Sequence, residues 1–229
     1  MKTMTVGERL AGVRSRIARA EQLSGRSPGS VRLVAVSKTQ PPEALIAAYR
    51  NKQRHFAENY LQEAVDKQQC LANYRITWHF IGPIQSNKTR TVANRFSWVH
   101  GVDRMKIARR LNEQRHADFG PLNICIQINI DNEISKSGIP LDQVSQFAAE
   151  ISELPNLRIR GLMAIPAAGQ STESARASFR RLREAFDALR ATGHRLDTLS
   201  MGMSGDLEIA IEEGSTLVRI GTSIFGPRR

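Results

Sequence analysis

The chain has 229 residues, 41% hydrophobic and 24% charged, and its 33 Lys and Arg outnumber 22 Asp and Glu to give a formal charge of +11. This composition excludes low-complexity disorder, membrane-spanning segments and a signal peptide, so we expect one cytoplasmic domain covering residues 1–229, with no membrane partner. The charge attracts anions, but the basic residues are dispersed, aromatic residues make up only 6%, and no nucleic-acid motif is present, so we expect no nucleic-acid partner.

The first predicted element is a helix that precedes the repeating pattern of the chain. Thr5 and Glu8 have the spacing of a capping box, in which each side chain caps the backbone of the other residue. Apolar residues then recur at intervals of three and four up to Ala20, which is one face of a helix, and Ser24-Gly25 ends it. We therefore expect an extra N-terminal helix outside the main fold.

Strands and helices alternate from residue 31 onward. The run at residues 31–37 is short, β-branched and almost continuously apolar, which is typical of a parallel strand buried on both faces. Similar runs recur, and the predicted strands cover residues 31–37, 54–57, 76–81, 96–99, 122–130, 157–163, 196–201 and 217–220. The predicted helices between them cover residues 41–50, 60–69, 87–93, 104–116, 141–154, 175–189 and 207–212. Asp103 is the predicted N-cap of the helix at 104–116.

Eight strand-helix units with no two strands close enough for a hairpin favour an α/β fold of one closed (β/α)8 barrel, the TIM barrel. An open doubly wound sheet is the alternative, but neither GxGxxG nor GxxxxGK[ST], the common nucleotide-binding fingerprints, follows the first strand. In a barrel, ligands bind at the carboxyl ends of the strands, and phosphate commonly binds the loops after the seventh and eighth. The strand ends are therefore the candidate site.

The two cysteines, Cys70 and Cys125, lie far apart and outside any CxxC or Cys/His cluster. They predict neither a disulfide framework nor a zinc site. We expect both thiols to be buried and reduced, and we expect no metal.

A lysine closes the first predicted strand. Lys38 follows Val34 and Val36 at the end of the apolar run, which places its amine in the mouth of a barrel. Partial desolvation there frees the lone pair of an amine for Schiff-base chemistry. The alternative is an ordinary lysine at the end of a strand.

Glycine- and hydroxyl-rich segments follow the seventh and eighth strands. Their sequences are Ser200-Met201-Gly202-Met203-Ser204-Gly205-Asp206 and Arg219-Ile220-Gly221-Thr222-Ser223-Ile224-Phe225-Gly226. Each offers backbone N–H groups, hydroxyls and the start of a short helix, which together bind anions, although either alone is compatible with a simple turn. Two such segments facing a strand-end lysine indicate a ligand with a phosphate at one end and an aldehyde at the other. Pyridoxal 5′-phosphate is the candidate cofactor.

Seven segments of the sequence together resemble a known protein family. They are VAVSKT (34–39), HFAENY (55–60), WHFIGxIQxNK (78–88), KSG (136–138), GLM (161–163), SMGMSGD (200–206) and RIGTxIFG (219–226). They resemble the YggS/PROSC family of pyridoxal phosphate homeostasis proteins, from the first helix to the last residue. The resemblance implies a stand-alone barrel similar to the N-terminal domain of alanine racemase, which buffers or delivers the cofactor without established enzymatic activity.

The resemblance also implies roles for individual residues. Lys38 would be the Schiff-base lysine, and Arg219 would face the pyridine nitrogen, where a permanent charge keeps that nitrogen unprotonated. The other implied cofactor-binding residues are Ser204, Gly205, Gly221 and Thr222 at the phosphate, and Asn59, His79 and Met201 at the mouth. For His79, a core histidine beside Trp78 is the alternative.

The main alternative function is an amino-acid racemase of the same fold type. Racemisation needs a second acid/base group on the opposite face of the cofactor, which the racemases take from a tyrosine of an additional domain. The resemblance gives no such role to Tyr49, Tyr60 or Tyr74. We therefore expect a carrier of the cofactor and not an enzyme.

A second lysine provides a hypothesis for cofactor exit. Lys136 lies in the Ser135-Lys136-Ser137-Gly138 loop after the fifth predicted strand. This amine could accept the aldehyde from Lys38 by transimination, and a solvated loop lysine is the alternative. The expected partners are pyridoxal phosphate itself and apo-enzymes that depend on it, and the expected state is a monomer.

Overall fold

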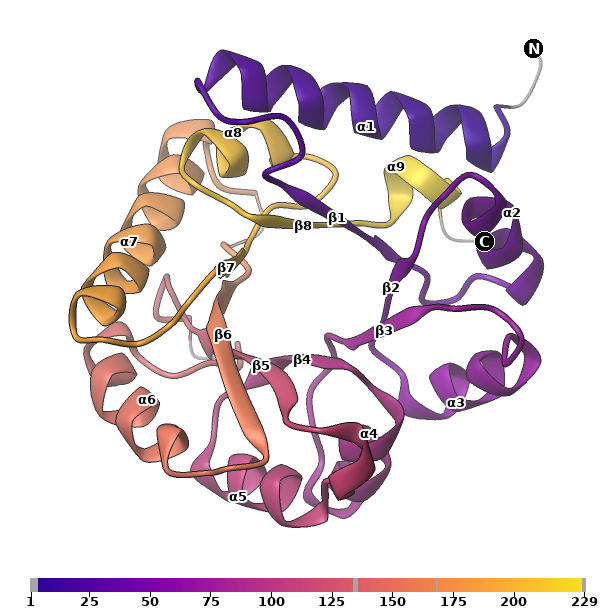
Figure 1. Ribbon diagram of the computed structural model, residues 1–229. Helices are drawn as coiled ribbons and strands as arrows, with labels where there is room; N and C mark the ends of the chain where they lie inside the picture. Colours follow the sequence, from indigo (N-terminus) through magenta and orange to yellow (C-terminus); the bar gives the residue numbers. More distant parts are fainter. Residues whose placement is uncertain (1–3, 134–135, 168, 228–229) are drawn as a thin grey trace.

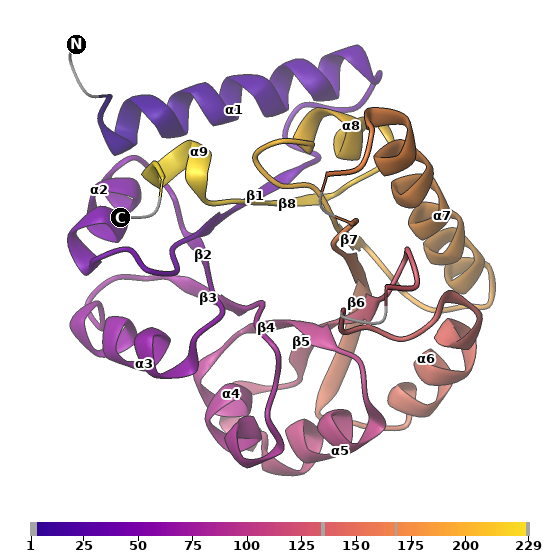
Figure 2. The same ribbon diagram turned by 180° about the vertical axis from the view of Figure 1, so that it is seen from behind.

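The strands of this protein form a closed ring with the helices outside it (Figures 1 and 2). The computed structural model describes residues 4–133, 136–167 and 169–227. Its strands are β1 (Arg32–Val36), β2 (His55–Glu58), β3 (Thr77–Phe80), β4 (Trp98–Val102), β5 (Leu122–Ile128), β6 (Leu157–Ala164), β7 (Thr198–Ser200) and β8 (Leu217–Ile220). Neighbours in the chain pair in parallel, and β8 pairs with β1 to close the ring. The predicted (β/α)8 barrel is confirmed, and the open sheet is wrong.

The helices follow the predicted order. They are α1 (Val6–Leu23), α2 (Pro42–Arg50), α3 (Leu61–Cys70), α4 (Thr89–Arg95), α5 (Met105–Gln114), α6 (Val144–Ser152), α7 (Thr172–Ala191), α8 (Leu207–Glu212) and α9 (Thr222–Phe225). Short 3₁₀ turns are η1 (Ser86–Lys88), η2 (Ala117–Phe119) and η3 (Leu141–Gln143). Over the described ranges, no helix combines the length and the apolar character needed to cross a membrane.

The extra helix α1 begins with the predicted capping box. The Thr5 hydroxyl accepts from the Glu8 N–H at 3.2 Å, and the Glu8 carboxylate accepts from the Thr5 N–H at 2.7 Å. Leu10, Val13 and Ile17 are buried in one apolar cluster with residues of α8, β8 and α9. Burying each such side chain contributes about 1.5–3 kcal/mol. As Figure 1 shows, α1 thus covers the part of the barrel where β8 meets β1.

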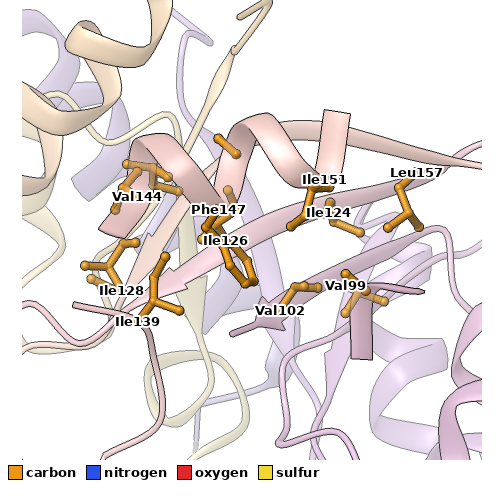
Figure 3. Close-up of a cluster of buried hydrophobic side chains, with 14 of the residues drawn as sticks. Val99, Val102, Ile124, Ile126, Ile128, Ile139, Val144, Phe147, Ile151 and Leu157 are labelled. Atoms are coloured by element: carbon orange, nitrogen blue, oxygen red, sulfur yellow. The ribbon is translucent and has the colours of Figure 1, made fainter. Parts of the chain in front are cut away.

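A large apolar cluster fills the space between the barrel wall and the outer helices. Ile124, Ile126 and Ile128 of β5 are buried there together with Phe147 and Ile151 of α6. Figure 3 shows these side chains gathered between the strand and the helix. The sequence of β5 alternates, with the isoleucines on the face toward α6 and Asn123, Cys125 and Gln127 on the opposite face.

The strand β4 runs three residues further than predicted. We expected it to end at Val99, but it continues through the buried His100 to Val102, with a register shift against β5. Arg104 and not Asp103 therefore occupies the N-cap position of α5, and the Asp103 carboxylate accepts from Arg104 Nε at 3.0 Å. Pairing within the barrel overrides the local cap signal here.

One of the two predictions for the cysteines is wrong. Cys125 on β5 is a buried free thiol, and burial raises its pKa to about 12. Cys70 is also free but exposed, at the last position of α3. The buried face of that helix carries Ala64, Lys67 and Gln68. At about 100° per residue, Cys70 lies roughly 120° around the helix from Ala64 and roughly 160° from Gln68, and it shares a side only with Lys67, so it stands away from the centre of this face.

Candidate functional site

Closure of the barrel brings distant parts of the chain to one place. All eight strands are parallel, so their carboxyl ends form a single rim. β1 pairs with β8 through Val34 and Arg219, and β8 lies next to β7. The residues that follow these three strands include Lys38, Ser204 and Thr222, which therefore lie on adjacent sectors of the rim.

The segments after β7 and β8 are joined to each other. The Ser223 N–H donates to Ser204 Oγ at 3.3 Å, which ties the two loops together at the rim. Gly221 lies against the end of β1, since a Cβ added there would be 3.2 Å from the Val36 carbonyl oxygen. Ser204 and Gly221 are half-buried, whereas Gly205 and Thr222 are exposed. These two joined loops, residues 201–206 and 221–226, present hydroxyl and backbone groups at the rim, and we call them the cup.

The extra helix α1 supports this cup. Arg16 donates to the Ser204 carbonyl oxygen at 3.1 Å and to both Glu208 carboxylate oxygens, at 2.6 and 2.8 Å. The hydrogen bond with Glu208 raises the pKa of Arg16, and the same bond lowers the pKa of Glu208. A bidentate pair of this kind fixes the orientation of the guanidinium. One side chain of the N-terminal helix therefore holds the backbone of the loop after β7.

Arg219 lies inside the barrel below the cup. It is 4% exposed and donates to the backbone oxygens of Ser200 and Ala164, and to Ser200 Oγ at 2.7 Å. Burial lowers its pKa to about 10, so the guanidinium is still charged at neutral pH. No carboxylate among the described residues forms an ion pair with it. These three bonds use three of the five N–H donors of an arginine, and the other two have no acceptor among the described residues.

A chain of hydrogen bonds runs from Arg219 across the interior of the barrel. His100 Nδ1 lies 2.8 Å from Ser200 Oγ, His100 Nε2 lies 2.9 Å from His79 Nδ1, and His79 Nε2 lies 3.0 Å from His55 Nδ1. Because arginine only donates, the arrangement that satisfies every group has Ser200 donating to His100, His100 to His79, and His79 to His55. Every member of the chain then turns an acceptor toward the buried charge of Arg219.

His55, His79 and His100, the three histidines of this hydrogen-bonded chain, are neutral. Burial lowers the pKa of His100 to about 3, with a further contribution from the charge of Arg219. Burial also lowers the pKa of His55 to about 4, assisted by the charge of Arg32. For His79, which is fully buried, burial holds the pKa well below its ordinary value. Neutral imidazoles are required for the chain, because a protonated ring has no acceptor nitrogen.

The remaining predicted residues lie around this centre. Lys38 is half-buried after β1, whereas Met201, directly after β7, is fully buried in the large apolar cluster between the barrel wall and the outer helices. Asn59, directly after β2, is half-buried, and its Oδ1 is buried without a hydrogen-bond partner among the described residues. His79 has both ring nitrogens in hydrogen bonds and stacks on Trp98, with ring centroids 5.4 Å apart.

The second predicted lysine is held by its surroundings. Lys136 Nζ forms an ion pair with Glu133 at 2.7 Å and donates to the carbonyl oxygens of Pro166 at 2.9 Å and Ile165 at 3.4 Å. It therefore links the segment after β5 to the segment after β6. Ser135, which the same prediction named, lies outside the described residues.

Sequence reasoning missed several residues of the interior. His55, His100 and Ser200 were not predicted to belong to the site, although Ser200 and His100 connect His79 to Arg219 and His55 extends the chain beyond His79. A signal was present, because a polar residue within a short apolar strand is unusual and three successive strands carry a histidine.

The fold and the site together define a barrel of the alanine racemase N-terminal domain class. Residues 10–229 match the family model described as alanine racemase, N-terminal domain. A protein of Pseudomonas aeruginosa named pyridoxal phosphate homeostasis protein is 54% identical over 224 residues, which cover 98% of this chain and 96% of the relative. The chain belongs to the family of pyridoxal phosphate homeostasis proteins, which confirms the resemblance found in the sequence.

Solved structures agree with this assignment. PipY of Synechococcus elongatus PCC7942, solved with pyridoxal phosphate bound, is 36% identical with a TM-score of 0.86, over 97% of this chain and all of that one (100%). An alanine racemase of Clostridium difficile 630 is 14% identical with a TM-score of 0.77, over 95% of this chain and 57% of that one. The second similarity concerns the fold alone.

Proposed function

We propose that this protein binds pyridoxal 5′-phosphate at the carboxyl rim of the barrel and serves in its homeostasis, by buffering the cofactor or delivering it. The observation that carries the proposal is the arrangement of Lys38, the cup after β7 and β8, and Arg219 on three adjacent strands. The name of the Pseudomonas aeruginosa relative and the ligand of PipY support it.

The chemistry of the rim fits this cofactor. In the proposal, the hydroxyls of Ser204 and Thr222 and the backbone N–H groups of Gly205 and Thr222 donate to the phosphate. Gly221 leaves room beside the end of β1, where a Cβ would come within 3.2 Å of a backbone oxygen. The buried Oδ1 of Asn59, which has no partner among the described residues, supports a ligand contact at the mouth, because a buried polar atom left without a partner is costly.

Lys38 holds the cofactor covalently in this proposal. When bound, pyridoxal phosphate supplies an aldehyde that condenses reversibly with a primary amine and releases one water. Lys38 provides this amine from the end of β1, while the cup retains the phosphate. Two separate attachments explain how a carrier could keep the cofactor and still give it up, since the covalent bond is reversible.

In the proposal, the position of Arg219 favours a carrier over a catalyst. A guanidinium at the pyridine nitrogen keeps that nitrogen unprotonated, which weakens the ring as an acceptor of electrons from a bound amino acid. The two N–H donors of Arg219 that have no described partner support this role. We therefore favour a carrier without catalytic activity, acting as a monomer toward apo-enzymes that accept the cofactor.

Two of the three tyrosines of the chain support the same choice. Tyr49 and Tyr74 pack against each other, with ring centroids 5.1 Å apart, and precede β2 and β3 at the opposite end of the barrel. Tyr60 is 53% exposed at the start of α3. Incubation with L-alanine in deuterated water tests the choice. Deuterium incorporation or D-alanine at about 1 s⁻¹, the low end of ordinary turnover, would restore the racemase.

Borohydride trapping tests the proposed function. The purified protein is loaded with pyridoxal phosphate, reduced with borohydride and digested, and the peptides are weighed by mass spectrometry. We expect the cofactor mass on the peptide that contains Lys38, and Lys38→Ala as the control should carry none. A label on another peptide of the unaltered protein refutes the assignment of Lys38, and a preparation that takes up no cofactor refutes the function.

A further inference from the structure

A cluster of charged side chains lies behind the segment that carries Lys38. Lys67 of α3 and Glu58 of β2 are nearly inaccessible, with side chains 5% and 0% exposed, and Lys67 Nζ donates to Glu58 Oε1 at 2.8 Å. Lys67 Nζ also donates to Glu63 Oε1 at 2.6 Å and to the Ser37 carbonyl oxygen at 2.6 Å. One buried ammonium thus binds two carboxylates and the backbone directly before Lys38.

The same cluster holds the chain on both sides of Lys38. On one side, Ser37 Oγ donates to Glu58 Oε1 at 2.6 Å. On the other side, the Thr39 N–H donates to Glu63 Oε1 at 2.6 Å. Thr39 has a φ of 63°, a left-handed conformation that is unfavourable for a β-branched residue and persists only where the surroundings fix it. The carboxylates and Lys67 provide those surroundings.

Stability of the fold does not by itself explain this cluster. A buried ion pair loses much of its attraction to the cost of removing two charges from water, and apolar replacements of similar volume often stabilise a protein equally well. In addition, Glu58 Oε2 is buried without a partner among the described residues. The cluster is costly to bury, and its groups bind both Ser37 and Thr39. Its effect on Lys38, the residue between them, therefore explains it better.

We propose that Lys67 is a positioning residue, which fixes the backbone of Ser37 and Thr39 and thereby aims the amine of Lys38 at the aldehyde held in the cup. The inference rests on the proposed function, because it assigns Lys38 the covalent attachment of pyridoxal phosphate. Lys67 itself touches neither the phosphate nor the aldehyde. Its contribution is the conformation of the residues around Lys38.

Two variants test this role without losing the fold. Lys67→Met together with Glu58→Gln removes both buried charges and keeps an amide oxygen for the Ser37 hydroxyl. Glu63→Ala removes a side chain that is 27% exposed and releases the Thr39 N–H. The matched control is Glu21→Gln. Glu21 is 2% exposed and accepts from Gly29, Ser30 and Val31 before β1, at the end of the strand remote from Lys38.

Three measurements distinguish positioning from support of the fold. In the protein without cofactor, amide hydrogen exchange of Thr39 should accelerate at least tenfold in both test variants and remain unchanged in Glu21→Gln. The rate at which borohydride-trapped cofactor accumulates on Lys38 should fall at least tenfold in the test variants alone. Affinity for pyridoxine 5′-phosphate, which has the ring and phosphate but no aldehyde, should stay within twofold of the unaltered protein.

The outcomes separate this inference from the proposed function. If the unaltered protein traps cofactor on Lys38 and both test variants trap it at the same rate, Lys67 has no positioning role. The role is also refuted if Glu21→Gln, with a lowered thermal midpoint, slows trapping as much as the test variants. If the unaltered protein traps none, the proposed function fails and the inference fails with it.

Discussion

The buried histidines should make this protein less stable in mildly acidic solution than at neutral pH. His79 and His100 are fully buried, and their pKa values lie well below the ordinary 6.5, at about 3 for His100. At pH 5 these two imidazoles therefore remain unprotonated in the folded protein, whereas each of them binds a proton in the unfolded chain. A group with a lowered histidine pKa stabilises the fold fully above pH 6.5 and loses that contribution as the pH falls.

The size of the effect follows from proton linkage. At pH 6.5 each histidine of the unfolded chain is already half protonated, so the two sites together lower the free energy of unfolding by about 3 kcal/mol between pH 6.5 and pH 5, less than the full 1.36 kcal/mol per pH unit and site. The half-buried His55, whose pKa is about 4, adds in the same direction. Glu58 acts in the opposite direction, because burial raises its pKa. The carboxylates with lowered pKa values, such as Asp131 and Asp197, contribute only at lower pH.

Urea unfolding at a series of pH values measures this dependence. Tryptophan fluorescence of the protein without cofactor gives the free energy of unfolding at half-unit steps from pH 7.5 to 5. His100→Gln should remove one of the two buried sites, and so roughly half of the slope attributed to them. His116→Gln, at a side chain 65% exposed, is the control and should leave the slope unchanged. A free energy that is flat from pH 6.5 to 5, or a slope unaffected by His100→Gln, would refute the reasoning.

Three further predictions concern the rim. Arg219→Ala should weaken pyridoxal phosphate binding by about 1.5–3 kcal/mol, the value of a hydrogen bond to a charged group, and should create no racemase activity; equilibrium dialysis and chiral analysis of alanine check both. Lys136→Ala should slow transfer to an apo-enzyme while bound cofactor stays nearly unchanged, and unaltered transfer kinetics would dispose of the exit route. Arg16→Ala should weaken phosphate binding severalfold with a loss of stability of only about 1 kcal/mol, as expected for a half-exposed ion pair. Arg19→Ala, on the exposed side of α1, is its control, and equal effects of the two would contradict a role in the cup.

The barrel was predictable from the sequence because its signals are local and repeated. Most of the parallel strands are short and largely apolar, and most of the outer helices have an apolar stripe, so the alternation of the two patterns indicates the fold. Local signals failed where tertiary pairing decides, as at Asp103, where the longer β4 moves the start of α5. They also failed for Cys70, because its burial depends on which side of α3 meets the barrel.

The candidate site was predictable only in part. Lys38 and the loops after β7 and β8 stand at strand ends, and the fold says that strand ends carry ligands. The interior chain through His55 and His100 could not be assembled, because the sequence does not say which residues of neighbouring strands point inward at matching heights in the barrel. Lys67 was missed for a related reason, since a lysine on an amphipathic helix resembles a solvent-exposed residue until the strand packed against that helix is known.

The position of the site on the closing seam has a consequence for how the chain matures. β1 and β8 pair in register although about 185 residues separate them, as in the pairing of Arg32 with Leu217. Lys38 and the cup therefore become neighbours only when synthesis has reached the end of β8 and the ring has shut. A ligand that spans both sides of this seam binds the closed ring and no shorter intermediate, so its binding energy is added wholly to closure. Occupancy of the site would thus report that a newly made chain has completed its barrel.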